Sequence, residues 1–253
     1  MKNKLLGIFL VLMFALTGCK YASAQNLGAI IAHEVYLQSE GDEPTICDKA
    51  LLLVFLTEVP NGEAYYTITS TLFEAERVNV HFPKIKMDNQ DQQEKVNTLI
   101  MDEKLRILDI FPDRENLTLD VNYEIKFSSN RLLSIAYTGI GFVQGATRPT
   151  HFFYTLNINI ETGEKIVLSD IVSVDEEFIT ILLSDDTTHL NTNEELGQFV
   201  REIILEERFL HMIQNAENIG FYFTAYSLGI SIDGLGGAAG DHAELEIRYE
   251  ALF

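Results

Sequence analysis

The sequence predicts an α+β fold in which an antiparallel β-sheet carries two long helices packed on one face. Segments rich in β-branched and aromatic residues follow one another through short turns, as paired strands do. Two longer segments with helical apolar spacing are inserted between groups of strands, and no regular β-α-β alternation occurs. We expect three regions: a lipoprotein signal peptide at 1–19, a tether and N-terminal extension at 20–64, and the folded domain at 65–253.

The first region has the three parts of a bacterial export leader. Lys2 and Lys4 supply a positive start, and Leu5–Leu16 is an almost uninterrupted apolar run. This run is shorter than the roughly 20 apolar residues of a membrane-spanning helix but suits a signal peptide. Leu16-Thr17-Gly18-Cys19 then resembles a lipobox, in which the Cys19 thiol receives the lipid. We therefore expect a lipid-anchored protein on the extracytoplasmic side of a membrane.

The second region offers an alternative to the lipid anchor. Ala22-Ser23-Ala24 is a second cleavage signal, which would give a secreted protein without lipid. Ile30–Tyr36 and Leu51–Leu56 are apolar runs too short to distinguish a strand from a buried helix. If Cys19 carries lipid, Cys47 has no partner within the chain and is expected to be a buried small hydrophobic residue.

The folded region is expected to begin with two strands and a helix. Tyr65–Phe73 and Arg77–Phe82 have strand composition, and Pro83 is expected to end the second. Asp88-Asn89 offers a helix N-cap, and apolar residues then recur at helical spacing through Asn89–Phe111.

Hairpins are expected to follow this helix. Leu117–Phe127 and Leu132–Phe142 flank a short polar turn. Apolar residues alternate from Phe152 to Ile160, which predicts a strand with one buried face. Thr162-Gly163-Glu164 is expected to turn that strand into a second one at Ile166–Leu168.

The last third of the domain mixes helices and strands. Ser173-Val174-Asp175-Glu176 resembles a capping box that would open a short helix through Leu183. Asp185–Asn191 is expected to be a polar loop, and an apolar stripe predicts a second long helix at Asn193–Gln214. Three further strands are expected, at Gly220–Thr224, Ser227–Ile232 and Glu244–Tyr249.

The charge of the chain narrows the class of partner. The formal net charge is −20, from 18 Lys+Arg and 38 Asp+Glu. Such a field repels nucleic acid and anionic headgroups, and it attracts cationic proteins. We expect no nucleic-acid partner and membrane contact only through the lipid anchor. Solubility alone would also explain the acidity.

A glycine-rich segment superficially matches a nucleotide-binding motif. Gly234-Leu235-Gly236-Gly237-Ala238-Ala239 fits G-x-G-x-x-A, but a dinucleotide site needs the motif to open a helix. Ala243–Tyr249 instead alternates like a strand. We therefore expect no cofactor, and we interpret the segment as a hairpin loop or a mobile binding loop.

No pattern of catalytic or metal-binding residues is evident. The six histidines include no i, i+4 pair of a zinc helix, and the densest cluster, Asp241-His242-Glu244, provides at most two converging ligands. There is no G-x-S-x-G or S-x-x-K nucleophile motif. We expect no metal site, no catalytic residue and no enzyme activity. An unrecognised hydrolase built on carboxylates that are paired only in space is kept as an alternative.

The folded region resembles a bacterial extracytoplasmic domain of unknown function, found in the sigma-V anti-sigma factor RsiV and in PdaC-like peptidoglycan deacetylases. The resembling segments, in order, are Phe82-Pro83-Lys84-Ile85, Glu94-Lys95-Val96-Asn97, Leu133-Ser134-Ile135, Gly145-Ala146, Asn157, Thr162-Gly163-Glu164, Leu168-Ser169-Asp170, Gly240 and Ile247-Arg248-Tyr249-Glu250. This chain departs from the family at Thr147, where a histidine often follows glycine-alanine. Any ligand role of that histidine is therefore not carried over.

The resemblance implies a binding role. The family's domain binds lysozyme in the anti-sigma factor, and this makes a cationic, lysozyme-type muramidase the first candidate partner. The deacetylase activity belongs to a catalytic domain that is not expected here. The candidate contact residues lie in two loops: Gln144, Thr147 and Arg148 in one, and Gly236, Gly237, Asp241 and His242 in the other.

A cell-wall glycan module is the second candidate. It predicts that Tyr123, Tyr137 or Tyr154 lines an exposed groove, whereas packing on a sheet face is the alternative role of each ring.

The two cysteines provide a test of the anchor. In a bacterial host, Cys19→Ser is expected to abolish incorporation of labelled palmitate and to move the protein out of the detergent phase on Triton X-114 partitioning, because the thiol that accepts the lipid is gone. Cys47→Ser is the matched control and is expected to behave like the wild type. Detergent-phase partitioning of Cys19→Ser would contradict the anchor.

Overall fold

The computed structural model describes residues 66–111, 115–190, 202, 204, 219–232 and 242–252. The chain divides into two compact units, Met1–Gln38 and Ser39–Phe253, and every described residue belongs to the second. The leader, Cys47, the glycine-rich segment and the predicted second long helix except Glu202 and Ile204 lie outside the described residues. Within the described part, no helix is long and apolar enough to cross a membrane.

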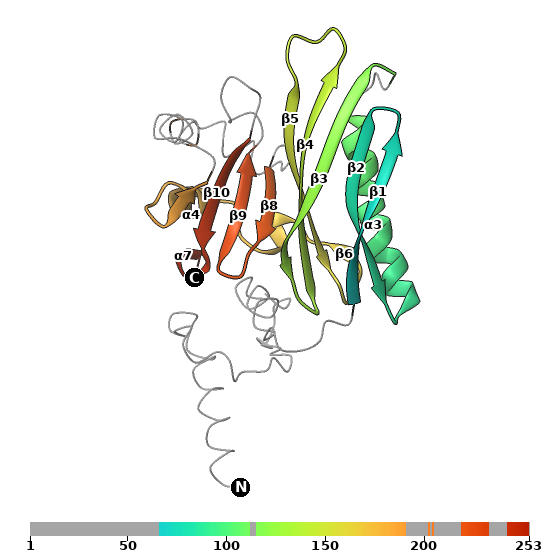
Figure 1. Ribbon diagram of the computed structural model, residues 1–253. Coiled ribbons are helices and arrows are strands. Elements are labelled where there is room, and N and C mark those ends of the chain that lie inside the picture. Colours follow the sequence, from blue (N-terminus) through green and yellow to red (C-terminus); the bar gives the residue numbers. More distant parts are fainter. Residues whose placement is uncertain are drawn as a thin grey trace. The chain divides into compact units, whose positions relative to one another are not determined.

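The larger sheet has six strands in sequential order (Figure 1). They are β1 (Tyr66–Ala75), β2 (Val78–Met87), β3 (Leu117–Ser128), β4 (Leu132–Val143), β5 (Thr150–Asn159) and β6 (Glu164–Lys165). All neighbours are antiparallel except β2 and β3, which pair in parallel over three residues. A parallel pair needs a crossover connection, and helix α3 (Gln90–Asp109) supplies it.

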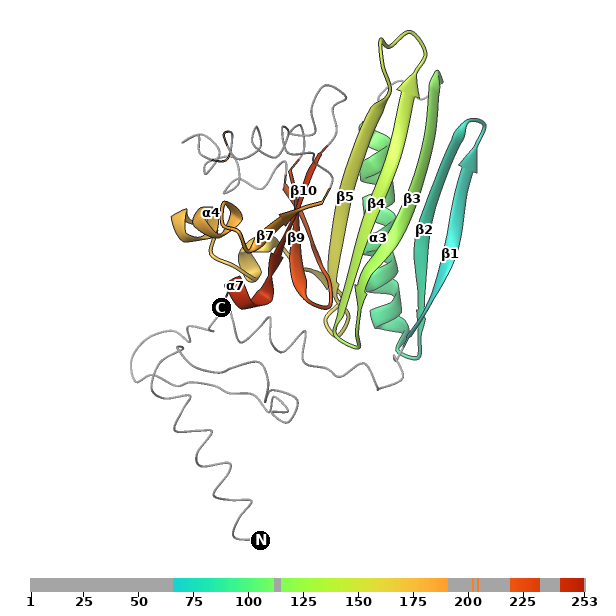
Figure 2. The ribbon, with the colours of Figure 1, turned by 60° about the vertical axis from the view of Figure 1, so that its left-hand side comes forward.

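The smaller sheet has four antiparallel strands in the order β7-β10-β9-β8 (Figure 2). Their bounds are β7 (Thr187–His189), β8 (Ile219–Phe223), β9 (Ser227–Ile232) and β10 (Ala243–Arg248). Three short helices accompany them: η2 (Leu168–Asp170), α4 (Glu176–Leu182) and α7 (Tyr249–Leu252). The predicted α+β class with antiparallel strands is confirmed. The strands form two sheets, where the sequence predicted one.

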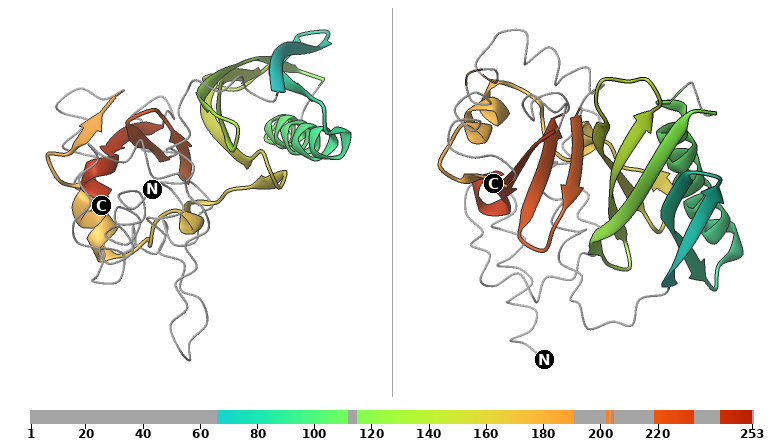
Figure 3. Two further views of the ribbon diagram at one scale, coloured as in Figure 1. Left: turned by 90° about the horizontal axis from the view of Figure 1, so that it is seen from below. Right: turned by 45° about the horizontal axis from the view of Figure 1, so that its top comes forward.

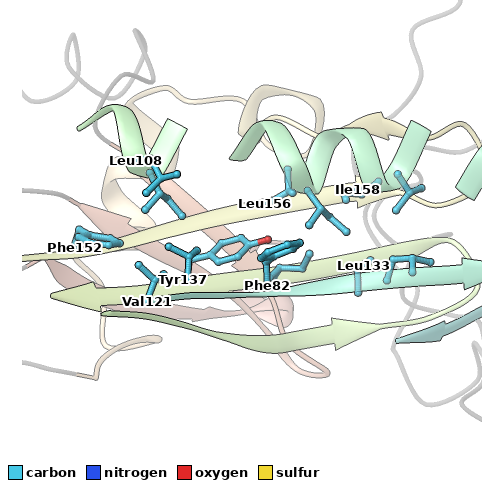
Figure 4. Close-up of a cluster of buried hydrophobic side chains, with 14 of the residues drawn as sticks. Phe82, Leu108, Val121, Leu133, Tyr137, Phe152, Leu156 and Ile158 are labelled. Atoms are coloured by element: carbon cyan, nitrogen blue, oxygen red, sulfur yellow. The ribbon is translucent and has the colours of Figure 1, made fainter. Parts of the chain in front are cut away.

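Helix α3 covers one face of the larger sheet (Figure 3). Asn89 caps it by accepting from the backbone N–H groups of Asp91 and Gln92, at 3.1 and 3.2 Å. Its buried apolar residues pack on inward-facing side chains of the sheet, among them Leu133, Tyr137, Leu156 and Ile158 (Figure 4). The predicted helix and the predicted strand at β5 are therefore confirmed. The expectation that one face of β5 is buried is wrong, because Phe153, Thr155 and Asn157 on its other face are buried too.

The prediction that Pro83 ends its strand is wrong, because β2 continues to Met87. Asn97 of α3 accepts from the Ile85 N–H at 2.9 Å and donates to the Ile85 carbonyl at 2.8 Å. The backbone N–H and carbonyl groups of the odd-numbered residues of β2 therefore point away from β1. Beyond Val80 these groups pair with no strand of the described part of the chain. A proline in that phase removes no ladder hydrogen bond. The helix asparagine thus replaces a missing strand partner.

Three smaller predictions also need correction. The N-cap of α4 is Asp175, not Ser173, because the Asp175 side chain accepts from the Phe178 N–H at 3.0 Å. The expected polar loop at Asp185–Asn191 contains β7, which pairs with the edge of β10. The strand expected at Ile166–Leu168 does not form, because β6 already ends at Lys165 and η2 begins at Leu168. Asp170 fixes η2 by accepting from the Val167 N–H at 2.9 Å.

The two sheets are joined where β8 meets the face of the larger sheet opposite α3. Asn157 donates to the Phe221 carbonyl at 2.7 Å, and Thr155 accepts from the Phe221 N–H at 3.0 Å. Ser134 accepts from the Phe223 N–H at 3.0 Å and donates to Asn157 at 2.6 Å. All three polar side chains are buried. These side chains supply the hydrogen-bond partners for backbone groups of β8 that a neighbouring strand would otherwise supply.

Removal of the central amide tests this junction. Asn157→Ala is expected to lower the free energy of unfolding by about 2–3 kcal/mol, because it leaves the Phe221 carbonyl without its donor and Ser134 without its acceptor in a buried site. Urea unfolding followed by circular dichroism measures the loss. Asn122→Ala, the same substitution on the exposed face of β3, is the control and should change the free energy by no more than about 0.5 kcal/mol. Equal effects of the two substitutions would show that the junction does not depend on Asn157.

Candidate functional site

The face of the larger sheet opposite α3 is covered at one end and exposed at the other. Even-numbered residues of β4 point to this face, since the odd-numbered ones pack against α3. Ser134 and Ala136 lie beneath the smaller sheet, whereas Ile140 is 42% exposed and Phe142 is 37% exposed. Figure 1 shows the β4–β5 hairpin extending beyond the strands of the smaller sheet.

We call the exposed part of this face the distal face. It comprises cross-strand neighbours on β3, β4 and β5: Thr118, Asp120, Asn122, Thr138, Ile140, Phe142 and His151. Asp120 pairs with Ile140, and Ile140 pairs in turn with His151. Two apolar side chains are thus framed by polar and acidic groups on a rigid sheet. Interaction surfaces are commonly built in this way.

One predicted contact loop forms the tip of the hairpin that carries this face. Gln144, Thr147 and Arg148 are all exposed there, as expected of contact residues. Gly145 has φ 97°, a left-handed conformation that glycine adopts without strain. The Gln144 N–H donates to the Asn116 carbonyl at 3.0 Å, which ties the tip to the chain that enters β3.

The second predicted contact loop is described only at its end. Gly236, Gly237 and Asp241 lie outside the described residues, whereas His242 immediately precedes β10. The His242 ring stacks on Phe153 of β5, with 4.4 Å between ring centroids and 22° between planes. Phe153 pairs with Thr138, so His242 lies at the base of the distal face. The structure therefore brings His242 to the same hairpin as the other three described candidates.

Sequence reasoning missed the apolar pair of the distal face. The segment Thr138-Gly139-Ile140-Gly141-Phe142 has its apolar residues in the phase opposite to Leu133, Ile135 and Tyr137, which face the core. A strand whose apolar residues change phase carries apolar side chains on both faces. That change of phase was the available signal.

A charged cluster lies where the distal face meets the smaller sheet. We call Lys126, Tyr222, Glu244 and Glu246 the junction cluster. The Tyr222 hydroxyl lies 2.6 Å from Glu244 Oε1 and 3.1 Å from Glu246 Oε1. Lys126 Nζ lies 3.9 Å from Glu244 and 4.8 Å from the centre of the Tyr222 ring. Lys126 occupies a bulge in β3, and bulges commonly redirect a side chain.

A glycine lets Tyr222 cross the smaller sheet. Gly229 of β9 lies between Tyr222 of β8 and Glu246 of β10 in the register of the strands. A Cβ at Gly229 would lie 2.1 Å from the Tyr222 ring carbon that bears the hydroxyl. Any side chain there would displace the ring and separate its hydroxyl from both carboxylates.

The cluster shifts two acid–base equilibria. Burial raises the pKa of Tyr222, and the hydrogen bonds and negative charges of Glu244 and Glu246 raise it further. Burial also raises the pKa of Glu244, but hydrogen bonds from His242 and Tyr222 and the charge of Lys126 outweigh it, so the net pKa is lowered. Tyr222 is therefore a neutral donor to ionised Glu244.

The junction cluster is better suited to joining the two sheets than to catalysing hydrolysis. It holds acid and base groups of the kinds that a hydrolase uses, but Tyr222 is fully buried and the side chains of Glu244 and His242 are 13% and 15% exposed. Within the described part of the chain, no three His, Cys, Asp or Glu side chains are placed to hold a metal ion. The cluster links β3 to β8 and β10, and Glu244 Oε2 lies 3.6 Å from His242 Nε2.

The tyrosines expected in an exposed glycan groove are placed otherwise. Tyr137 is fully buried, which contradicts that expectation. Tyr123 and Tyr154 are half-buried and pack against the core beneath α3. All three point to the helix-covered face because they fall in the inward phase of their strands.

Comparisons with known proteins found distant similarity to solved structures alone. No family model matches the chain, and no curated protein matches it. Two of the solved structures to which the chain is similar are DUF3298 family proteins. One, from Pseudomonas aeruginosa PAO1, is 11% identical with a TM-score of 0.39, covering 76% of this chain and 94% of the other. The second, from Bacteroides fragilis NCTC 9343, is 11% identical with a TM-score of 0.42, covering 73% and 90%.

The raised pKa of Tyr222 predicts a stability change at high pH. An unfolded chain releases tyrosine protons near pH 10, whereas the folded chain keeps the Tyr222 proton. Stability from this group is therefore complete below about pH 10 and is lost as the pH rises further. Urea unfolding between about pH 8 and 11 should show a shallower loss in Tyr222→Phe than in the wild type. Tyr226→Phe, on a ring that is 83% exposed, is the matched control. An unchanged slope in Tyr222→Phe would contradict the assignment.

Proposed function

We propose that the chain is a non-catalytic binding module that holds a cationic protein on its distal face, outside the cytoplasm. The observation that carries the proposal is the exposed pair Ile140 and Phe142, on the same hairpin that presents Gln144, Thr147 and Arg148 and contacts His242. Exposed apolar residues framed by polar ones are typical of a contact surface.

Charge supports the class of partner. The chain carries a net charge of −20, and Asp120 lies directly beside Ile140. A basic partner would be steered toward such a protein over a Debye length and would then bury the apolar pair. The resemblance to the RsiV-type domain makes a lysozyme-type muramidase the first partner to test.

Anchoring would give this role a location. A lipid on Cys19 would tether the domain to a membrane, with residues 20–64 as the spacer. A tethered, acidic module without its own chemistry suits capture or sensing of a soluble basic protein. The hydrolase alternative receives no support from the junction cluster, since its hydroxyl and carboxylates are mostly covered.

Binding to hen lysozyme tests the proposal. The double variant Ile140→Ser/Phe142→Ser is expected to bind immobilised lysozyme at least about tenfold more weakly than the wild type, because two apolar contacts are lost from the centre of the surface. Biolayer interferometry at about 50 mM salt measures the affinity, and about 500 mM salt should weaken it strongly. Tyr226→Ser, which removes an exposed aromatic ring from the β8–β9 turn, is the control.

Each result decides a different part of the proposal. Loss of binding in the double variant but not in the control supports the distal face. Equal binding by all three proteins would place the contact elsewhere. An affinity that does not change with salt concentration, or no binding of the wild type at low salt, would overturn the proposal of a cationic partner of this kind.

A further inference from the structure

A pocket of about 330 Å³ opens at the other end of the larger sheet from the hairpin tip. Four chain segments converge there: the start of β1, the end of β2 with the first turn of α3, the β3–β4 turn, and the β5–β6 turn. The lining residues are Tyr66, Met87, Asp88, Asn89, Gln92, Asn130, Ile160 and Glu161. Loops held by a rigid sheet are a common position for binding sites.

The apolar part of the pocket is fixed by the fold. Tyr66 and Ile160 are each 5% exposed and belong to the main core, and Met87 packs against the same core. The Tyr66 hydroxyl donates to the Ser129 carbonyl at 2.8 Å and lies 2.9 Å from the Ser128 hydroxyl. The aromatic ring is therefore held in place before any ligand arrives.

The polar part of the pocket is amide-rich and partly tied together. Gln92 Nε2 donates to the Glu161 carbonyl at 2.5 Å, and Glu161 Oε1 accepts from Arg131 Nε at 3.1 Å. Carboxamides of Asn89, Gln92 and Asn130 line the pocket; the Asn89 oxygen already caps α3, whereas its amide nitrogen can donate and the Gln92 side-chain oxygen can accept. Asp88 adds an exposed carboxylate acceptor.

We propose that this pocket binds one uncharged saccharide ring that carries hydroxyl and acetamido groups. The apolar floor of Tyr66, Met87 and Ile160 suits the C–H face of a ring and an acetamido methyl, while carboxamides match hydroxyl and amide groups. The volume lies at the lower end of the range for small-ligand sites, which fits one ring better than a long chain.

The same lining disfavours other ligand classes. Asp88 and Glu161 repel anions such as phosphates and uronic acids. A wholly apolar ligand would gain no hydrogen bond from the polar lining and would cover the exposed Asp88 carboxylate, at a desolvation cost. The saccharide pocket is independent of the proposed protein-binding role, since it uses other residues at the other end of β4 and β5.

Isothermal titration calorimetry of the full-length chain with N-acetylglucosamine tests the inference. The wild type is expected to bind saturably. Asn130→Ala should weaken binding about fivefold, the worth of one neutral hydrogen bond. Met87→Trp should abolish binding by filling the floor. Asn79→Ala, the same amide removal on β2 outside the pocket, is the control. Sodium glucuronate is the control ligand and should bind at least about tenfold more weakly because of its charge.

The outcomes separate this inference from the protein-binding proposal. Thermal unfolding by circular dichroism shows that each variant is folded and does not depend on the pocket or on lysozyme binding. Saturable binding that is weakened in Asn130→Ala, lost in Met87→Trp and kept in Asn79→Ala supports the pocket. No saturable binding by the wild type, equal binding by Met87→Trp, or glucuronate binding as tight as N-acetylglucosamine would overturn it.

Discussion

The attachment of strand β8 to the back of the larger sheet decides how the rest of the domain is organised. An edge strand presents unpaired N–H and carbonyl groups, and burying them without partners is costly. Ser134, Thr155 and Asn157 provide those partners from β4 and β5, in positions that would otherwise hold outward-facing side chains. Their polarity makes the contact directional. The smaller sheet therefore meets the larger one at a defined edge, where a purely apolar contact would allow it to slide.

The surfaces left for binding follow from this attachment. The smaller sheet covers one end of the outer face and leaves the hairpin end, with Ile140 and Phe142, exposed. The junction cluster adds a second link through Lys126 and Tyr222 and brings His242 against Phe153. Helix α3 seals the opposite face and helps to form the pocket at the far end. One sheet thus separates two candidate surfaces of different chemistry: an acidic-framed apolar face and an amide-lined pocket.

Much of the fold could be predicted from local patterns. Alternation along Phe152–Ile160, the apolar spacing and N-cap of α3, and the hairpin turn before Leu132 each depend on neighbours a few residues apart. The exposed positions of Gln144, Thr147 and Arg148 also followed from a turn between two strands. The errors arose where a distant residue satisfied the backbone. Pro83 lies inside a strand whose unpaired edge is hydrogen-bonded by the Asn97 side chain. The segment before Leu190 forms β7 because it pairs with the edge of β10.

The sequence by itself therefore determined the fold class, the order of most elements, the acidic character of the protein and the presence of a hairpin tip. Only the tertiary structure decided that the strands divide into two sheets, that Asn157 is a buried link, and that His242 shares a surface with the β4–β5 hairpin. The reason is the sequence separation of the interacting residues. Side-chain periodicity reports on which residues face inward, whereas buried hydrogen bonds between residues such as Asn157 and Phe221 join segments whose separation along the chain carries no signal of their contact.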